Sequence, residues 1–420
     1  MLSADLAKPS WLTDCSVGIK ESYDNNVFLS GVNNPPPIPA PAGSVAALKN
    51  CASWITTVSP KVGVNFSPII GATNVPTLSL AYAPDVAVYH DQTSESYTAH
   101  RVLAAVEAET EPATFSADNN FTYIDGSGMG PFYPGNELSA FATVADRERR
   151  RQINDRANLN VQLDQEKWFI RPTESLLYYN MMTEQLNVPG YQNYCDRYDV
   201  NGGADFGYKL TPQLALTLGY RYGHQYQQQY SFSPYSSSSD YQRVLAGIEG
   251  NPWKWLTVKI QGGPDFRNYQ GDSATHTTPV NDLHPVTYYD EASLIATFAP
   301  DNTLTFKTKS WQWVSCLGKT PYFDSAYELV WHRKLMDKLV LDLGGKILDW
   351  DFNSGNLPAS KREDLQYTTS AGLNYAVNSH ISITLAGVLN WGRNAENDVT
   401  NPGVRQFDQQ LISLGTQWKF

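Results

Sequence analysis

The sequence predicts an all-β fold, a transmembrane antiparallel β-barrel of about 18 strands with short turns on one rim and long loops on the other. Three observations support this prediction. Apolar residues alternate with small or polar ones, connections alternate between short and long, and the chain ends on an aromatic residue. A period of two is typical of a strand with one apolar face, and about ten residues suffice for a tilted strand to cross a bilayer.

The alternation is clearest in the second half of the chain. In residues 214–223, leucines and tyrosines form one row, and the opposite row is Ala215, Thr217, Gly219, Arg221 and Gly223. Residues 339–347, 365–375 and 381–391 repeat the pattern. A soluble sandwich more usually exposes Lys and Glu. The row of Gly, Ser, Thr and Asn therefore favours a wet and crowded barrel lumen.

Connections between these segments alternate in length. The short ones contain turn residues and lie at residues 111–112, 211–213, 251–252, 300–302, 336–338 and 378–380. The longer polar segments are residues 31–49, 125–149, 184–193, 231–239, 271–284, 353–363 and 394–404. This arrangement predicts short periplasmic turns, long extracellular loops, and both termini on the short-turn rim.

Composition excludes other classes of protein. Asp and Glu number 42 against 31 Lys and Arg, a balance that does not suit a nucleic-acid-binding protein. No run approaches 18 consecutive apolar residues, which excludes a helical membrane span. The 25 Tyr and 11 Trp suit aromatic girdles at the membrane interfaces. The pairs expected to be interfacial anchors rather than sugar-binding platforms are Tyr178 and Tyr179, Trp253 and Trp255, Tyr288 and Tyr289, and Trp311 and Trp313.

Both ends of the chain are informative. Residues 411–420 alternate up to Trp418 and Phe420, which resembles the closing strand of a bacterial outer-membrane barrel. The resemblance implies that these two residues are an assembly signal read by the barrel-assembly machinery; an edge strand of a soluble sheet is the alternative. The amino-terminus lacks a basic and then apolar region, so we expect an exported chain whose signal peptide has been removed. Residues 1–10 are expected to be a periplasmic segment, and residues 11–420 a single barrel domain.

Three segments near the amino-terminus share a pattern with a known family. The first strand ends in Tyr-Asp-Asn-Asn-Val-Phe at residues 23–28, the next contains Val58-Ser59-Pro60, and a third ends on Tyr82. This order resembles the outer-membrane β-barrel porin family of Gram-negative-type cells, over the amino-terminal strands only. The resemblance implies an outer-membrane barrel. Some relatives lie beside polysaccharide-export genes, and others are called porins.

Charged residues on the polar rows are predicted to line the lumen. A charge on the lipid-facing row is costly at mid-bilayer, whereas one in the lumen is hydrated or paired. The strand residues assigned to the lumen are Arg156, Asp205, Arg221, Arg243, Glu249, Lys259, Lys307, Glu328, Asp342 and Lys346. Either these charges pair across neighbouring strands and stabilise the wall, or their basic excess favours anionic solutes.

A run of charges closes the longest central loop and includes Arg149, Arg150 and Arg151. These arginines are expected to form a basic constriction that folds into the pore. Alternatively, they bind lipopolysaccharide phosphates, or they are a solvated charge run.

Enzyme motifs are absent from the sequence, as are phosphate loops and His or Cys at metal-ligand spacing, so we expect no enzyme, cofactor or metal. Cys195 and Cys316 lie near predicted loop-side strand ends, and whether they pair is left open. The function expected is an outer-membrane porin-like channel for passive diffusion of small hydrophilic solutes. The alternatives are a secretion barrel for an exopolysaccharide and a plugged structural or interaction barrel. Expected partners are outer-membrane lipid, lipopolysaccharide, the assembly machinery and the solute or polysaccharide, without nucleic acid.

Overall fold

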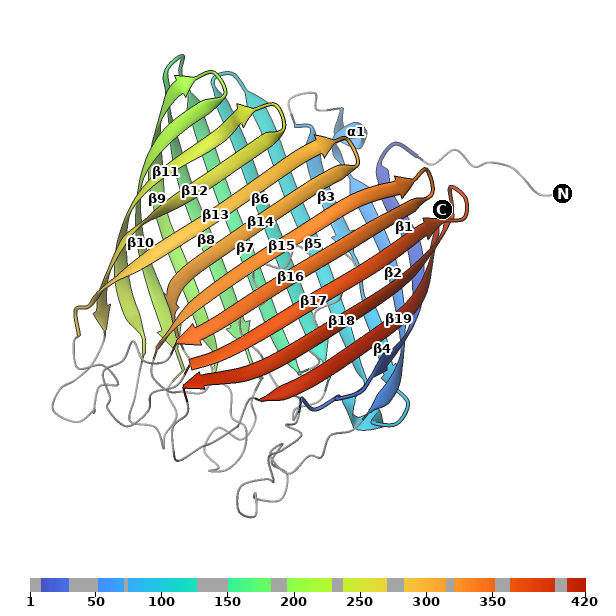
Figure 1. The fold of residues 1–420 in the computed structure, drawn as a ribbon. Helices are drawn as coiled ribbons and strands as arrows, with labels where there is room; N and C mark the ends of the chain where they lie inside the picture. The colour runs from blue at the N-terminus through green and yellow to red at the C-terminus, as the bar shows by residue number, and fades with distance from the viewer. Residues whose placement is uncertain are drawn as a thin grey trace.

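The computed structural model describes residues 9–29, 52–71, 75–126, 150–182, 195–228, 237–269, 283–314, 321–351, 363–396 and 406–420. Within them the chain forms one sheet of 19 strand segments (Figure 1). The sheet closes on itself because β1 (Leu12–Asp24) pairs with β19 (Phe407–Lys419). Two short segments, β3 (Thr77–Tyr82) and β4 (Asp85–Tyr89), share one position between β2 and β5, so the barrel has 18 strand positions. The predicted fold class is confirmed.

The other elements follow in chain order around the wall. They are β2 (Ser53–Asn65), β5 (Tyr97–Thr110), β6 (Ala113–Asp125), β7 (Gln152–Asp164), β8 (Trp168–Asn180), β9 (Arg197–Thr211), β10 (Leu214–Gln227), β11 (Ser239–Trp253), β12 (Leu256–Tyr269), β13 (Val286–Ala299), β14 (Asn302–Trp313), β15 (Tyr322–Met336), β16 (Leu339–Asp351), β17 (Glu363–Ala376) and β18 (Ile381–Glu396). Helix α1 (Ser67–Ile70) and the 3-10 helix η2 (Thr93–Glu95) are short. No helix in the described ranges is long and apolar enough to cross a membrane.

Strand length and tilt match the thickness of a bilayer. Strands such as β6, β7 and β8 contain 13 residues each. At about 3.3 Å per residue and a tilt of about 40°, such a strand spans about 30 Å along the barrel axis. This is the thickness of the hydrocarbon core of a typical membrane.

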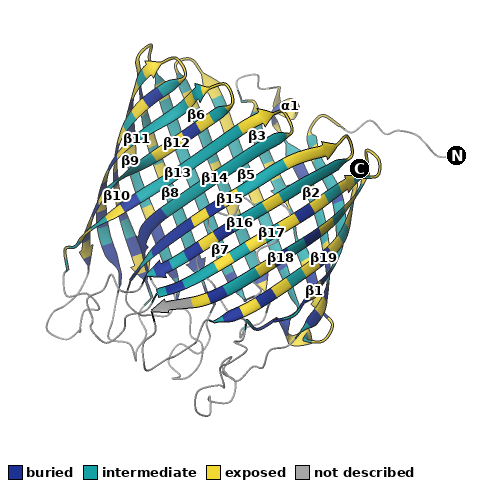
Figure 2. Ribbon diagram, in the orientation of Figure 1, coloured by how far each residue is buried: buried dark blue, intermediate teal, exposed yellow. Residues whose placement is uncertain are grey.

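The period of two sorts side chains between the outer wall and the lumen. Along β10, Leu218 is 59% exposed on the outer wall, whereas Ala215 and Arg221 are buried on the inner one. Figure 2 shows this alternation of exposed and covered positions along many strands. The apolar outer row is what a wall facing lipid requires, because hydrocarbon offers no hydrogen bonds to polar groups.

Some predicted boundaries were wrong. Residues 251–252 were expected to be a turn, but they lie inside β11, where the register with β12 shifts between Gly250 and Trp253. The short connection at residues 165–167 was not predicted. Several residues predicted to end a loop belong to strands instead, among them Asp125, Ser239 and Asn394.

Two buried clusters lie inside the barrel towards the long-loop rim. The larger, called here the aromatic cluster, consists of Tyr179, Met181, Leu245, Tyr289, Trp311, Trp313, Val314, Tyr322, Ala326, Leu348 and Trp350. The prediction that Trp311, Trp313, Tyr179 and Tyr289 are interfacial anchors was therefore wrong, because these rings face inward. Trp253 and Trp255 do lie on the outer wall and stack at 5.7 Å between ring centroids.

The smaller cluster, called here the seam cluster, lies where the barrel closes. Val27 and Phe28, which end the family-like motif, pack with Ile55, Ala87 and Tyr89. The preceding residues bind the last strand: Gln409 donates to Asp24, and Asn26 donates to the Asp408 carbonyl at 2.9 Å. The motif therefore ties β1 to β19 at the long-loop rim.

Candidate functional site

The strand residues assigned to the lumen do lie on inward-facing positions. They are Arg156, Asp205, Arg221, Arg243, Glu249, Lys259, Lys307, Glu328, Asp342 and Lys346. Arg149 lies outside the described residues, as does Cys316. Arg150 is 3% exposed and Arg151 is half-buried beside the start of β7. Whether any of these residues sets selectivity stays a prediction.

An ion-pair cluster on β8 to β11 surrounds Arg171. Its guanidinium binds both carboxylate oxygens of Glu249, at 2.8 and 2.7 Å, and also contacts Asp205 at 3.1 Å. The other oxygen of Asp205 contacts Arg221 at 2.7 Å. Two cations and two carboxylates thus compensate each other, as expected for a wall stabilised by paired charges.

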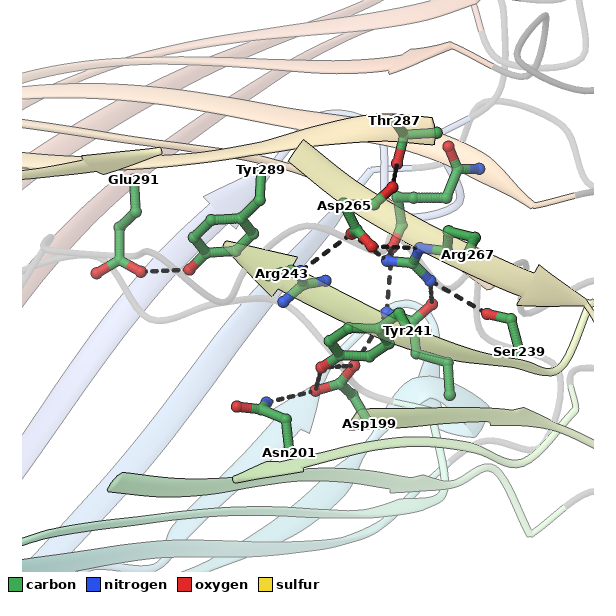
Figure 3. A network of polar contacts seen from close by, with 12 residues as sticks. Asp199, Asn201, Ser239, Tyr241, Arg243, Asp265, Arg267, Thr287, Tyr289 and Glu291 are labelled. Carbon is green, nitrogen blue, oxygen red and sulfur yellow. Dashed lines mark hydrogen bonds and ion pairs between the residues drawn. The ribbon is translucent and has the colours of Figure 1, made fainter. Parts of the chain in front are cut away.

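A second cluster, on β10 to β14, lies nearer the long-loop rim (Figure 3). Asp265 accepts from Arg267 at 2.7 Å and from Arg243 at 3.0 Å, and all three residues are buried. Arg267 also donates to Gln225 at 2.6 Å and to the Gln312 carbonyl at 3.0 Å. One carboxylate is therefore shared by two guanidinium groups.

Asp199 on β9 completes the network with neutral donors. Tyr241 donates to its carboxylate at 2.9 Å, Gln225 at 3.0 Å and Asn201 at 2.9 Å (Figure 3). Tyr241 can approach this closely because Gly223 has no side chain beneath its ring. Close backbone approach of this kind is a common reason for glycine inside a strand.

These clusters border a cavity of about 390 Å³ in the lumen. Six cations and four carboxylates are among its lining residues. The cations are Arg156, Arg171, Arg221, Arg243, Lys259 and Lys309, and the carboxylates are those of Asp118, Asp199, Asp205 and Glu291. Cations thus exceed carboxylates among the residues that line the cavity, although Glu249 and Asp265 bind Arg171 and Arg243 from outside this set. The whole chain carries a formal net charge of −11.

Two of the cations are not fully compensated by partners among the described residues. Nη2 of Arg243 is buried and has no hydrogen-bond partner among the described residues. The guanidinium lies 4.0 Å from the ring centroid of Tyr241 and 4.5 Å from that of Tyr289, which fixes its position (Figure 3). Lys259 is exposed to the lumen and forms no ion pair within the described ranges. A fixed guanidinium and an exposed lysine that line one cavity can together attract a small anion.

Other predicted lumen charges lie on the neighbouring strands β14 to β16. Glu328 is in register with Lys307 on one side and with Lys346 on the other. Asp342 accepts a hydrogen bond from His332 at 2.7 Å in the tautomer that carries its hydrogen on Nδ1. Alternating signs across adjacent strands favour pairing within the wall.

Just outside the strands, Asp196 lies at the long-loop rim. It accepts a hydrogen bond from the Met181 backbone N–H at 2.8 Å. Burial raises the pKa of Asp196 above its ordinary value, and this hydrogen bond opposes the rise.

Sequence reasoning missed several members of the site. They are Arg171, Asp199, Tyr241, Asp265 and Arg267. Alternation alone places two of them inward, because Arg171 lies between outward Ile170 and Pro172, and Asp265 precedes outward Phe266. Their partners depend on strand register, which the sequence does not reveal. In the described part of the chain, no group of three or more His, Cys, Asp or Glu is placed to hold a metal ion.

Comparisons with known proteins give fold likeness at low identity. No protein-family model and no curated protein matches the sequence. Pseudomonas aeruginosa OpdK, solved with vanillate, is 10% identical with a TM-score of 0.44, over 97% of this chain and 98% of that one. Pseudomonas aeruginosa OpdO is 12% identical with a TM-score of 0.44, over 97% and 96%. The siderophore receptor PirA from Pseudomonas aeruginosa is 8% identical with a TM-score of 0.39, over 97% and 80%. These scores carry no inference about what this chain transports, and the porin-family resemblance stays a prediction.

Proposed function

We propose that this protein is an outer-membrane porin-like channel for passive diffusion of small hydrophilic solutes, with a preference for anions. The closed barrel with an apolar outer wall supports a place in a membrane. The polar inner wall supports a water-filled path, because side chains alone do not fill a barrel of about 18 strands. We further propose that residues 11–420 are one barrel domain and that residues 1–10 are periplasmic.

The single observation that carries the preference for anions is the lining of the lumen cavity. Its cations outnumber its carboxylates, and Arg243 retains a buried donor without a partner. A cationic lining in a narrow, partly dehydrated passage attracts an anionic group more strongly than it would in bulk water. Paired charges such as Arg171 and Glu249 hold the surrounding wall in place.

Partners follow from the proposed location. The outer wall would contact outer-membrane lipid, and the long-loop rim would contact lipopolysaccharide. Trp418 and Phe420 are outward and stack at 4.7 Å, so they are available to the barrel-assembly machinery as a terminal signal. Secretion of an exopolysaccharide stays an alternative prediction from the family resemblance.

The plugged barrel is a second candidate, and the aromatic cluster favours it. Trp313 and Trp350 are almost fully buried inside the barrel and reduce its free cross-section. A lumen filled in this way throughout would not conduct. The described residues nevertheless leave the cavity of about 390 Å³ beside the cluster.

Solute uptake by proteoliposomes separates these functions. Swelling rates are measured with glucose, gluconate and glucosamine, which have similar sizes and different charges. The channel proposed here passes all three and passes gluconate fastest. Absence of swelling with every solute would indicate the plugged barrel, and fastest entry of glucosamine would refute the preference for anions.

A further inference from the structure

The outer wall is hollowed across β5 to β10. A cavity of about 680 Å³ lies there, and its lining is mostly apolar. Small outward residues form its floor, namely Ala104, Ala117, Ala157 and Gly202. Within a membrane, small residues at a contact allow another protein backbone to approach closely.

A carboxylate lies in this hollow at mid-membrane depth. Glu174 is the middle residue of the 13 in β8, and it is exposed on the same outer row as Ile170. Within the described ranges it forms no ion pair and no side-chain hydrogen bond. A carboxyl group facing lipid at this depth is unfavourable, and ionisable groups placed there usually serve a function.

A carboxamide lies on the other side of the hollow. Asn119 is the middle residue of the 13 in β6 and also belongs to the outer row. Its Nδ2 donates to Asp155 at 2.6 Å and to the Arg156 carbonyl at 3.4 Å, which leaves Oδ1 as an acceptor. This oxygen can accept a hydrogen bond from the O–H of a protonated carboxyl group.

Asn119 and Glu174 are arranged symmetrically about β7. Asn119 is in register with Ala157, and Glu174 with Leu159, the next outward residue of β7. At a tilt of about 40°, a step of two residues along a strand changes the depth in the membrane by about 5 Å. A step of two strands across the sheet changes it by about 6 Å. The step from Ala157 to Leu159 leads towards the short-turn rim, whereas the step from β6 to β8 leads towards the long-loop rim in a wall slanted as in Figure 1. The two changes nearly cancel, so the two side chains lie at nearly equal depth.

We propose that a second copy of this chain packs into this hollow about a twofold axis that is parallel to the barrel axis and passes outside the wall, opposite Ala157 and Leu159. Rotation about this axis brings each Glu174 opposite the partner's Asn119, so the interface contains two equivalent pairs of Glu174 and Asn119. Two carboxyl groups that would face lipid alone thus gain hydrogen-bonding partners. Hydrophobic association is weak between surfaces already in lipid, so close packing and this polar pair hold the dimer together.

Mass measurement of three proteins tests the role of the polar pair. Native mass spectrometry from mild detergent is expected to show a dimer for the wild type and its loss for Glu174→Leu. Glu174→Gln is expected to retain the dimer, because an amide still bonds to the partner's Asn119. Leu suits a lipid-facing position, so the Glu174→Leu monomer should remain folded, with unchanged migration on unboiled gels. A monomeric wild type, with or without bound lipid, would overturn the proposal, as would an intact Glu174→Leu dimer.

Cross-linking tests the position of the axis independently. A short membrane-permeant bismaleimide is expected to link Ala157→Cys to its own copy in membranes, since residues beside a twofold axis meet their symmetry mates. Ile383→Cys, outward on β18, and the unmodified chain with its native cysteines are the controls, expected to remain unlinked. Linkage at Ile383→Cys but not at Ala157→Cys would place the contact elsewhere and overturn the proposal.

Discussion

Gly207 and Gly223 show how single residues shape the inner wall. Phe169 lies directly over Gly207, and Tyr241 lies directly over Gly223, so a Cβ at either glycine would overlap a ring. Tyr241 in turn binds Asp199 and supports the guanidinium of Arg243. The absence of one methyl group therefore positions the cation that carries the proposed preference for anions.

Replacing Gly223 by alanine should destabilise the barrel by about 1–3 kcal/mol, because the ring of Tyr241 must move to make room. The temperature at which the compact form disappears from semi-native gels measures this change. Gly345→Ala is the matched control, because an added Cβ there meets open space. Equal stability of the two variants would show that Tyr241 does not depend on the gap.

Lys259→Gln should reduce the preference for anions without affecting folding, because this lysine is exposed to the lumen and unpaired within the described ranges. Loss of one charge changes the energy of a passing anion by about 0.5–1 kcal/mol, a roughly two- to fivefold change in ion preference. Reversal potentials at low salt, where screening is weakest, give the ratio. Arg333→Gln removes an outward charge near the short-turn rim and should leave the ratio unchanged. An effect of Arg333→Gln equal to that of Lys259→Gln would place the selectivity outside the lumen.

At the scale of elements, side-chain contacts join the first and last strands in addition to the backbone hydrogen bonds between β1 and β19. Residues 25–28 turn inward after β1, so that Val27 and Phe28 enter the seam cluster. Asp24 accepts from Gln409 and from the backbone N–H of Asn26, at 3.2 and 3.0 Å. The segment that resembles a porin family in sequence thus has a structural role in joining the first and last strands.

Asp24→Ala should destabilise closure by about 1–3 kcal/mol, since it leaves buried donors of Asn26 and Gln409 without their acceptor. The compact form on unboiled gels should then be lost at a lower temperature than in the wild type. Asp337→Ala makes the same truncation at a fully exposed turn residue and should have little effect. Equal shifts in the two variants would mean that the seam does not limit stability.

The sequence predicted some parts of the site and not others, for physical reasons. Alternation sufficed to place Arg221, Lys259 and Lys346 inward, because side chains on a strand can face only two ways. The same alternation places Trp311 inward with Lys309, but aromatic residues near strand ends were interpreted as a girdle instead. The pairing of Arg243 with Asp265 depends on register, which is set by the whole barrel.

At the scale of the whole molecule, the lumen is asymmetric. The aromatic cluster and the two ion-pair clusters occupy the strands between β8 and β16, and the seam cluster lies across the closing strands. Figure 2 shows buried residues gathered towards the long-loop rim. A passage bordered by fixed cations, rather than a uniform wide pore, is the arrangement that the described residues support.

The central claim is that this passage is open and favours anions. Its most direct test is the reversal potential of the purified wild-type protein in a planar bilayer under a potassium chloride gradient at low salt. We predict stable conductance and a reversal potential displaced towards the chloride equilibrium potential, because cations exceed carboxylates in the lumen cavity. Absence of conductance, or a displacement towards the potassium equilibrium potential, would contradict the account.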